Sequence, residues 1–589
     1  MIADAPNLNA LWAELIIEEL FRNAVDTFFL APGSRCAPLT VAVARHPKVR
    51  SVVHHDERGL AYCGVGYARA ANRPAAIICT SGTAVANLLP GVVEASYAGL
   101  PLILLTADRP PELQDAGANQ TIRQPGVFGE FVRWEHTFPC PDRSVPATAV
   151  LTTIDQAVYQ AHAAPAGPVH LNCMYREPLA PVRSGDDFAE YLAPLTRWQK
   201  GTEPYTRYEA PGKAAPENLE PLAEILLNTA RGVLVTGQLS KPADCLAVRD
   251  LTAALNWPTL PDAASGLRLG PDLAPIVHYY DQMLLAPRVR SLLSSETVLH
   301  LGGTVTSKRL SGHLQEFSPH NYVLVSDHPF RQDPSHRVTQ RIAMPIAEFC
   351  EALSPHLTPD RADSETPPLH EVSRHVGDAI EAYLDARKAL YEPAVARLVS
   401  RLIPDGHGLF VGNSLPIRDL DMYAAVTPRL VPVFANRGAS GIDGNAATIA
   451  GIAIGSDRPV TGIIGDLALM HDLSSLALLR KTPVPVTLVV LNNNGGGIFS
   501  FLPVADYPDV FEWYFATPHG YTFEHAAGLF GLEYFRPKTP DAFISTYQHC
   551  SNGGEASVIE VVTNRDENLR VHRELQEAVR TALDSNPIH

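Results

Sequence analysis

The chain has 589 residues, of which 46% are apolar and 19% are charged, and its formal net charge is -16. This length exceeds what one hydrophobic core supports, so about three domains are expected. The negative charge argues against nucleic acid and anionic membranes as partners, because both repel an acidic protein.

The N-terminal region begins with acidic residues, among them Asp4, Glu14 and Glu18, and carries no basic leader. No 18-residue apolar run is present. These features predict a cytoplasmic protein without a membrane partner. The eight cysteines form no C-x-x-C pair, so we expect buried thiols rather than zinc ligands or disulfides.

In chain order, apolar strand-like runs alternate with helix-like segments, which predicts parallel sheets. The expected strands are 27–30, 49–53, 75–79, 101–106 and 168–172, then 232–236, 298–301 and 322–325, and finally 409–411, 431–434, 460–464, 485–491 and 557–562. Segments rich in Pro, Gly and charge at 194–216 and 354–368 read as linkers. We therefore predict an α/β chain of three doubly wound parallel-sheet domains, at 1–195, 217–353 and 370–589.

Gly64-Val65-Gly66 lies within an expected helix, which favours helix packing over a dinucleotide loop.

Two polar segments in the last domain follow neighbouring predicted strands. Gly465-Asp466-Leu467 ends one strand, Asn492-Asn493-Asn494-Gly495 ends the next, and 26 residues separate Asp466 from Asn493. Ligands bind at the carboxyl ends of such strands. Mg²⁺ could bind there to one carboxylate, one amide oxygen and a carbonyl such as that of Gly495, and the bound Mg²⁺ would hold a diphosphate. Ordinary Gly-Asp and Asn-Gly turns are the alternative.

These segments resemble the cofactor motif of thiamine-diphosphate enzymes, and three similar α/β domains match that superfamily's layout. The resemblance implies thiamine diphosphate with Mg²⁺ or Mn²⁺ as cofactors. It also implies a glutamate against the aminopyrimidine in the first domain, where Glu57 ends the second predicted strand. Such a residue should be buried and share a proton with the cofactor. A solvated carboxylate paired with Arg58 is the alternative for Glu57.

Further cofactor contacts follow from the same resemblance. Ile442 would be the apolar wedge that bends the cofactor, unless it is an ordinary core isoleucine. Gly412, Asn413 and Ser414 follow a third-domain strand and could donate hydrogen bonds to phosphate.

Strand ends and loops in all three domains carry cations, namely Arg35, Arg109, Lys308, Arg309, Arg418 and Arg437. Several guanidinium groups in one pocket would suit substrates with several carboxylates. Each cation could equally be a separate surface charge.

The motifs around these residues narrow the resemblance to one family. They are Pro32-Gly33-Ser34-Arg35, Asp56-Glu57-Arg58-Gly59, Thr80-Ser81-Gly82-Thr83-Ala84, Thr106-Ala107-Asp108-Arg109-Pro110-Pro111, Gly117-Ala118-Asn119-Gln120, Asn436-Arg437-Gly438-Ala439-Ser440-Gly441-Ile442-Asp443-Gly444 and Asn492-Asn493-Asn494-Gly495-Gly496. They resemble the 2-succinyl-5-enolpyruvyl-6-hydroxy-3-cyclohexene-1-carboxylate synthases of menaquinone biosynthesis, in which Leu467 is the normal residue.

The resemblance implies a transferase that decarboxylates 2-oxoglutarate and adds a succinyl carbanion equivalent to isochorismate in a conjugate, Stetter-like addition. Ser414, Arg418 and Arg437 would bind carboxylates of the keto acid or its adduct. Around isochorismate the family pattern places Ser34, Arg35, Arg109, Asn119, Gln120, Lys308 and Arg309. Gln120 could also assist proton transfers. The superfamily layout implies a homodimer at minimum and a homotetramer as a pair of dimers, with Glu57 acting on the cofactor held by Asp466 of the other subunit.

Two rival hypotheses stay open at this point. The chain could be another 2-oxo acid decarboxylase or carboligase, or a non-catalytic paralogue that binds the cofactor. The second rival predicts a lost carboxyl group at position 57 or lost metal ligands, and the sequence retains both.

Overall fold

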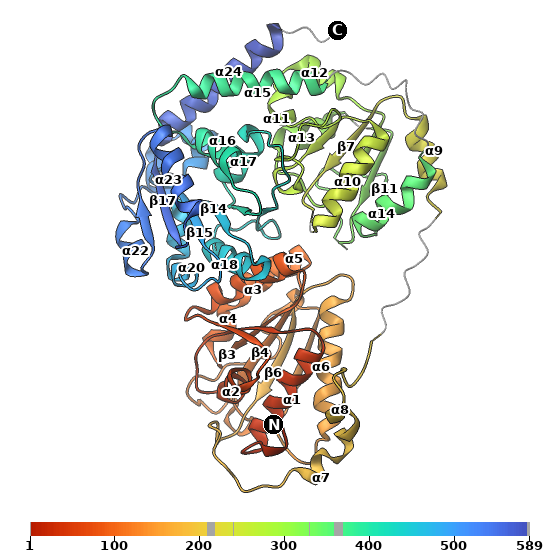
Figure 1. The fold of residues 1–589 in the computed structure, drawn as a ribbon, viewed down its shortest axis with the longest axis vertical. Helices are drawn as coiled ribbons and strands as arrows, with labels where there is room; N and C mark the ends of the chain where they lie inside the picture. Colours follow the sequence, from red (N-terminus) through yellow and green to blue (C-terminus); the bar gives the residue numbers. More distant parts are fainter. Residues whose placement is uncertain are drawn as a thin grey trace. The chain divides into compact units, whose positions relative to one another are not determined.

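The computed structural model describes residues 2–208, 218–239, 241–317, 319–328, 330–357 and 369–585. It contains three sheets of six, five and six strands. Within each sheet, neighbouring strands run parallel to each other. Figure 1 shows the three sheets with their helices. The predicted α/β class with three parallel-sheet domains is thereby confirmed, whereas the exact domain boundaries stay predictions.

By their internal contacts the residues form two compact units, which are described separately. The first unit comprises 1–212, 436–457 and 471–483, and the second comprises 213–435, 458–470 and 484–589. The first sheet thus lies in the first unit, and the other two sheets lie in the second.

The first sheet has the strand order β2-β1-β3-β4-β6-β5. Its strands are β1 (Thr27–Leu30), β2 (Arg50–Val53), β3 (Ala75–Cys79), β4 (Leu102–Asp108), β5 (Trp134–Phe138) and β6 (Val169–Met174). The helices of this unit are α1 (Leu8–Arg22), α2 (Ala37–Arg45), α3 (Glu57–Ala71), α4 (Thr83–Asn87), α5 (Leu89–Ala98), α6 (Ala147–His162), α7 (Ala189–Leu192), α8 (Thr196–Lys200), α18 (Asn445–Ser456) and α20 (Leu476–Leu479). Alternate strand residues face α1, α2 and α6 on one side, while Phe29 contacts Tyr67 of α3 on the other. The sheet is therefore covered on both faces, as a parallel sheet requires.

The middle sheet has the order β11-β10-β9-β7-β8. Its strands are β7 (Gly232–Thr236), β8 (Thr259–Pro261), β9 (Thr297–Leu301), β10 (Asn321–Val325) and β11 (Gln340–Ile342). The accompanying helices are α9 (Glu220–Asn228), α10 (Pro242–Leu255), α11 (Tyr280–Met283), α12 (Pro287–Leu292), α13 (Lys308–Glu316) and α14 (Ile346–Leu353).

The third sheet has the order β13-β12-β14-β15-β17-β16. Its strands are β12 (Gly408–Val411), β13 (Val433–Phe434), β14 (Val460–Gly465), β15 (Val486–Asn492), β16 (Glu533–Phe535) and β17 (Ser557–Val562). Its helices are α15 (Leu369–Asp385), α16 (Glu392–Leu402), α17 (Leu415–Tyr423), α19 (Asp466–His471), α21 (Pro508–Phe511), α22 (Glu524–Leu529), α23 (Pro540–Asn552) and α24 (Arg565–Ser585).

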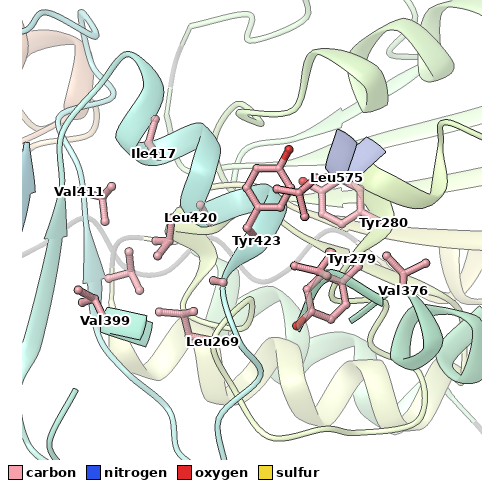
Figure 2. Close-up of a cluster of buried hydrophobic side chains, with 14 of the residues drawn as sticks. Leu269, Tyr279, Tyr280, Val376, Val399, Val411, Ile417, Leu420, Tyr423 and Leu575 are labelled. Atoms are coloured by element: carbon pink, nitrogen blue, oxygen red, sulfur yellow. The ribbon is translucent and has the colours of Figure 1, made fainter. Parts of the chain in front are cut away.

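One continuous apolar core joins the middle and third sheets of the second unit. Figure 2 shows part of it, with Ile417, Leu420 and Tyr423 of α17 among side chains from α11, α15 and α24. Tyr423 and Leu575 are fully buried. Because α17 is fixed along this apolar face, its N-terminal end is held at the edge of the third sheet.

Residues 194–208 correct the first linker prediction. This segment contains α8, and Trp198 is buried in the core of the first unit. The Trp198 indole N–H donates to Glu19 Oε2, and the backbone N–H of Tyr205 donates to Glu19 Oε1, both at 2.5 Å. The prediction was wrong here because composition alone does not reveal one large anchoring side chain. Residues 209–216 of that linker, and 358–368 of the second, lie outside the described residues.

Gly66 confirms the predicted helix-packing role of the Gly64-Val65-Gly66 segment. A Cβ at Gly66 of α3 would lie 2.1 Å from the Thr448 carbonyl oxygen of α18, and one at Gly451 would lie 1.9 Å from the Cys63 carbonyl oxygen. The two helices therefore cross with their backbones in contact, which only glycine permits.

All eight cysteines are buried free thiols, as predicted. Within the described residues, no helix is both long enough and apolar enough to span a bilayer.

Candidate active site

The polar segments predicted to meet do follow three adjacent strands of the third sheet. Gly412, Asn413 and Ser414 follow β12, Asp466 follows β14, and Asn493 follows β15, and these strands neighbour one another in that order. Between β12 and β14 the strand order reverses direction, and such a switch point is where open α/β sheets bind ligands.

Asp466 is the acidic residue of this edge and is almost fully buried. Its Oδ1 accepts from the Leu467 N–H at 2.7 Å, and its Oδ2 accepts from the Gly495 N–H at 2.9 Å and lies 3.1 Å from His519 Nε2. Burial raises the pKa of Asp466, and the Gly495 and His519 contacts oppose that rise. A carboxylate offers about four lone pairs, so Oδ1 keeps capacity for a further ligand.

The three consecutive asparagines differ in what their side-chain oxygens bind. The side-chain oxygen of Asn492 accepts from the Asn494 N–H at 3.1 Å, and that of Asn494 accepts from the N–H groups of His519 and Gly520 at 3.0 and 2.7 Å. Asn493 Oδ1 is buried and has no hydrogen-bond partner. A buried carbonyl oxygen without a donor is unusual and calls for a ligand.

These groups fit a hard divalent cation. Asp466 supplies a carboxylate, Asn493 an orphan amide oxygen, and Gly495 a carbonyl that accepts one bond from the Gly497 N–H at 2.9 Å and retains a second lone pair. Gly495 has φ +126°, and a Cβ there would lie 2.0 Å from the Ala516 carbonyl oxygen, so the loop requires glycine. Magnesium needs few such oxygen ligands when substrate phosphates and water complete its shell. Within the described residues, no group of three or more His, Cys, Asp or Glu side chains could hold a metal. The candidate site differs in kind, because only one of its three ligands, Asp466, is a side chain of these four types.

Two buried glutamates that the motifs did not indicate support the asparagine loop. Asn493 Nδ2 donates to Glu392 Oε1 at 3.0 Å, and Asn492 Nδ2 donates to Glu560 Oε1 at 2.5 Å. Burial raises the pKa of Glu392 to about 8, with the nearby charge of Asp419 as the next cause. Glu392 is 101 residues from Asn493, so no local sequence signal could connect them.

The N-terminal end of α17 lies beside this loop's sheet edge. Ser414 precedes α17 with φ +75°, a left-handed conformation that is uncommon for serine, and the Ile417 N–H closes a turn on the Gly412 carbonyl at 3.1 Å. Arg418 Nη1 donates to the Ser414 carbonyl oxygen. Backbone N–H groups at a helix start favour phosphate or carboxylate ligands.

In the first unit, the predicted loops gather at the carboxyl edge of the first sheet. A Cβ at Gly33 would lie 2.3 Å from Thr80 Cβ, so the loops after β1 and β3 touch. Gln120, at φ +58°, reaches back and donates from Nε2 to the Ser81 carbonyl at 2.9 Å. Arg109 donates to the Asn119 carbonyl from Nε and Nη2 at 3.2 and 2.9 Å.

Gln124 is a supporting residue that the sequence did not reveal. It is fully buried, accepts from the Gly82 N–H at 3.0 Å and donates to Asn172 Oδ1 at 2.8 Å. Asn172 in turn donates to Asp108 at 2.9 Å. This network fixes the loops that carry Arg109 and Gln120.

Arg35 and Ser34 differ in exposure although they are adjacent. Ser34 is exposed, whereas Arg35 is buried and donates from Nη1 to the Tyr175 carbonyl at 2.9 Å. Arg35 Nη2 lies 3.9 Å from Glu177 Oε1. Burial lowers the pKa of Arg35, and the positive charge of Arg109 lowers it further.

Glu57 is the first residue of α3 and is half-buried. The helix that Glu57 begins packs against β1, where Tyr67 contacts Phe29, and against β3, where a Cβ at Gly64 would lie 3.0 Å from Ile77 Cδ1. Arg58 donates to the His471 carbonyl oxygen. Pairing with Arg58 was the alternative role for Glu57, and the contact to His471 weakens that alternative.

Ile442 and Arg437 belong to the first unit with the segment 436–457. Ile442 is half-buried, and its carbonyl accepts from Asn445 Nδ2 at 3.0 Å. The adjacent Asp443 accepts from the Tyr62 hydroxyl at 3.2 Å. Arg437 is half-exposed.

The two middle-domain cations both begin α13. Lys308 is exposed, whereas Arg309 donates from Nη1 to Asp281 Oδ1 at 2.5 Å and contacts Met422 Sδ at 3.7 Å. Arg309 therefore already has a carboxylate partner within the protein.

Comparison with known proteins adds to this geometry. Family models match at 12–127 (thiamine pyrophosphate enzyme, N-terminal TPP binding domain), 189–411 (middle domain) and 424–561 (C-terminal TPP binding domain). The 2-succinyl-5-enolpyruvyl-6-hydroxy-3-cyclohexene-1-carboxylate synthase of Rubrobacter xylanophilus is 49% identical over 97% of this chain and 98% of its own length, and that of Salinibacter ruber is 47% identical over 99% and 98%. The chain belongs to the 2-succinyl-5-enolpyruvyl-6-hydroxy-3-cyclohexene-1-carboxylate synthase family.

Membership in this synthase family confirms the resemblance found in the sequence, and the matching domain models support thiamine diphosphate as the cofactor. The fold has a solved counterpart in the thiamine diphosphate-dependent 4-hydroxybenzoylformate decarboxylase of Rhodococcus jostii, with a TM-score of 0.70 over 94% of this chain and 99% of that one. The two sequences are only 17% identical, so this likeness supports the fold of the chain and says nothing about its substrates.

Proposed function

We propose that this protein decarboxylates 2-oxoglutarate and transfers the resulting succinyl unit to isochorismate. The product would be 2-succinyl-5-enolpyruvyl-6-hydroxy-3-cyclohexene-1-carboxylate, an intermediate of menaquinone biosynthesis, and the protein would act in the cytoplasm. The observation that carries this proposal is the match to synthases of that name along nearly the whole length of both chains.

Thiamine diphosphate, when bound, supplies the electron sink for decarboxylation and the carbon nucleophile for transfer. Asp466, Asn493 and the Gly495 carbonyl would hold Mg²⁺ or Mn²⁺ against its diphosphate. The support is the buried, unpartnered Oδ1 of Asn493 beside a buried carboxylate. Gly412, Asn413, Ser414 and Leu467 would line the same end of the third sheet, where the start of α17 favours anionic groups.

Glu57 would hold a proton at the aminopyrimidine N1′ atom, and Ile442 would press on the cofactor as an apolar wedge. The support for Glu57 is its position at the start of α3, the helix that packs against β1 and β3. The support for Ile442 is the partial exposure of its side chain. Glu57→Gln should keep diphosphate binding but slow deuterium exchange at the bound cofactor by about 10²- to 10⁴-fold.

Both substrates are dianions, and the cations would bind their carboxylates. Ser414, Arg418 and Arg437 would contact the keto acid, and Ser34, Arg35, Arg109, Asn119, Gln120, Lys308 and Arg309 would surround isochorismate. Arg35 and Arg109 support this because both follow strands at the carboxyl edge of the first sheet, where Arg109 is held by the Asn119 carbonyl. Gln120 would also orient a proton during transfer.

A homodimer at minimum, and a homotetramer as a pair of dimers, follows from the family layout. Each active site would combine Glu57 of one subunit with Asp466 of the other. Light scattering on the purified protein would measure the assembly size directly.

One assay tests the activity. The protein is mixed with thiamine diphosphate, Mg²⁺, 2-oxoglutarate and isochorismate, and the adduct is identified by mass. Keto acid turnover should rise when isochorismate is added. Equal turnover with and without isochorismate would contradict the synthase assignment and favour a plain 2-oxo acid decarboxylase, and no turnover at all would favour a non-catalytic paralogue.

A further inference from the structure

The side-chain amide of Asn493 can bind a cation in only one of its two orientations. Its oxygen must face the cation, because the NH₂ group has no lone pair to donate. In the structure the NH₂ group faces Glu392, with Nδ2 and Oε1 3.0 Å apart, and the oxygen is left buried and unpartnered. Something must keep the amide in that orientation when the cation is absent.

Glu392 has the contacts to do this. It is 1% exposed at the start of α16, and its Oε1 accepts from both Asn493 Nδ2 and Thr563 Oγ1, each at 3.0 Å. Oε2 is buried without a hydrogen-bond partner. Both donors therefore converge on one oxygen, and a rotated Asn493 amide would set its own oxygen against that acceptor.

We propose that Glu392 is a positioning residue for the cation site: it fixes the Asn493 amide so that Oδ1 is presented to the metal. This inference rests on the proposed function, which assigns Asn493 as a metal ligand. Glu392 would act on metal affinity without touching the metal, as residues that orient metal ligands do.

The neighbouring pair gives a contrast. Glu560 holds the amide of Asn492 in the same way, but the Asn492 oxygen accepts from the Asn494 N–H. Glu560 thus shapes the loop, whereas Glu392 orients Asn493, whose oxygen accepts no hydrogen bond from the rest of the triplet or its loop. A purely structural role for Glu392, as an acidic residue at a helix start, would predict a loss of stability with no specific loss of metal binding.

The test measures Mn²⁺ binding to the full-length protein with saturating thiamine diphosphate, using electron paramagnetic resonance of free Mn²⁺. Glu392→Met, which keeps the side-chain volume, should raise the Mn²⁺ dissociation constant about 10- to 100-fold. Glu392→Gln should bind Mn²⁺ nearly as the unaltered protein does, because a carbonyl at Oε1 keeps both donors. Thr563→Val is the matched control, since it removes the other donor to Oε1, and its affinity should stay unchanged.

A double-mutant cycle separates orientation from general damage. In an Asn493→Ala background, Glu392→Met should weaken Mn²⁺ binding no further. An equal loss in both backgrounds, or unchanged affinity in Glu392→Met alone, would overturn the proposal. If the unaltered protein binds no Mn²⁺, the metal site of the proposed function fails instead.

A second variant covers the case in which Glu392→Met does not fold. Asn493→Asp removes the Nδ2 donor that fixes this side chain on Glu392, so Mn²⁺ binding should weaken through lost orientation. Adding Glu392→Gln reverses the hydrogen bond, because the glutamine NH₂ can donate to the new carboxylate, and affinity should recover. Failure of Glu392→Gln to restore binding in that background would count against the positioning role.

Discussion

At the residue scale, the asparagine triplet shows what a motif can and cannot reveal. The sequence places three identical side chains after β15, and the resemblance selects Asn493 among them. Only the structure gives the physical reason, because the oxygens of Asn492 and Asn494 are occupied by backbone N–H donors and that of Asn493 is not. The donors come from the same loop and from residues near 519, and no local pattern announces them.

The triplet supports a graded prediction. Asn493→Ala should raise the Mg²⁺ concentration needed for half-maximal activity at least about tenfold, because it removes a metal ligand. Asn494→Ala should have a smaller effect, because it frees the loop at His519 and Gly520 without removing a ligand. Activity titrated with Mg²⁺ measures both. Equal shifts in the two variants would argue that Asn493 is no different from its neighbour.

The cations show what a count of charged residues cannot reveal. Counting Arg and Lys at loop positions predicts a polyanion site, but it does not show which charges are already paired. Arg309 binds Asp281 and Arg35 is buried against the Tyr175 carbonyl. Both partners are distant in sequence, so the pairing depends on tertiary structure that spacing cannot encode.

At the element scale, the strands that the sequence did not predict are β5, β8, β11 and β16, and each lies at the edge of its sheet. The predicted strands include every interior one. An interior strand in a parallel sheet is buried on both faces and reads as a continuous apolar run. Edge strands such as Glu533–Phe535 and Gln340–Ile342 are short and partly exposed, so their apolar signal is weak.

The crossing of α3 and α18 gives a prediction for the element that begins with Glu57. Gly451→Ala should destabilise the protein by about 1–3 kcal/mol, because its Cβ would overlap the Cys63 carbonyl oxygen. Gly312→Ala on α13 is the control, since nothing lies within 4 Å of a Cβ there, and it should be neutral or stabilising by up to about 1 kcal/mol. Thermal unfolding compares the two. A Gly451→Ala protein as stable as the control would mean that the helices can separate at little cost.

The segment that was taken for a linker is attached through a pair of buried acids. Glu19 accepts from Trp198 and Tyr205, and Asp155 accepts from the Thr206 N–H at 2.7 Å. Burial, together with the hydrogen bond to Asp155, raises the pKa of Glu19 from 4.5 to about 8. Two adjacent carboxyl groups can share one proton but cannot both ionise without repulsion.

This pair predicts how stability depends on pH. Between about pH 4.5 and about pH 8 the unfolded chain releases the Glu19 proton while the folded chain keeps it, so stability falls as pH rises. The slope should reach up to about 1.4 kcal/mol per pH unit. Asp155→Asn should flatten it by removing the neighbouring charge. Unfolding followed by Trp fluorescence across this window measures the slope, and identical slopes in both proteins would exclude the pair as its source.

At the scale of the whole molecule, the chain repeats one parallel-sheet design three times, and the candidate site residues lie in loops of all three sheets. The first and third sheets each place polar loops at a switch point, between β1 and β3 and between β12 and β14. The alternation of strands and helices made this architecture predictable from sequence. The compact units were less predictable, because 436–457 and 471–483 belong with the first sheet although they flank strands of the third.

The proposed sharing of active sites between subunits predicts that two inactive variants restore activity when they form a mixed dimer. Glu57→Gln and Asp466→Ala should each abolish activity in a homodimer. When the two variants are coexpressed, a mixed dimer would place both defects in one site and leave the other site with an intact Glu57 and an intact Asp466. Activity should therefore return in proportion to the mixed dimers formed. If each site were instead built from one chain, every site would carry one defect, and coexpression would restore nothing.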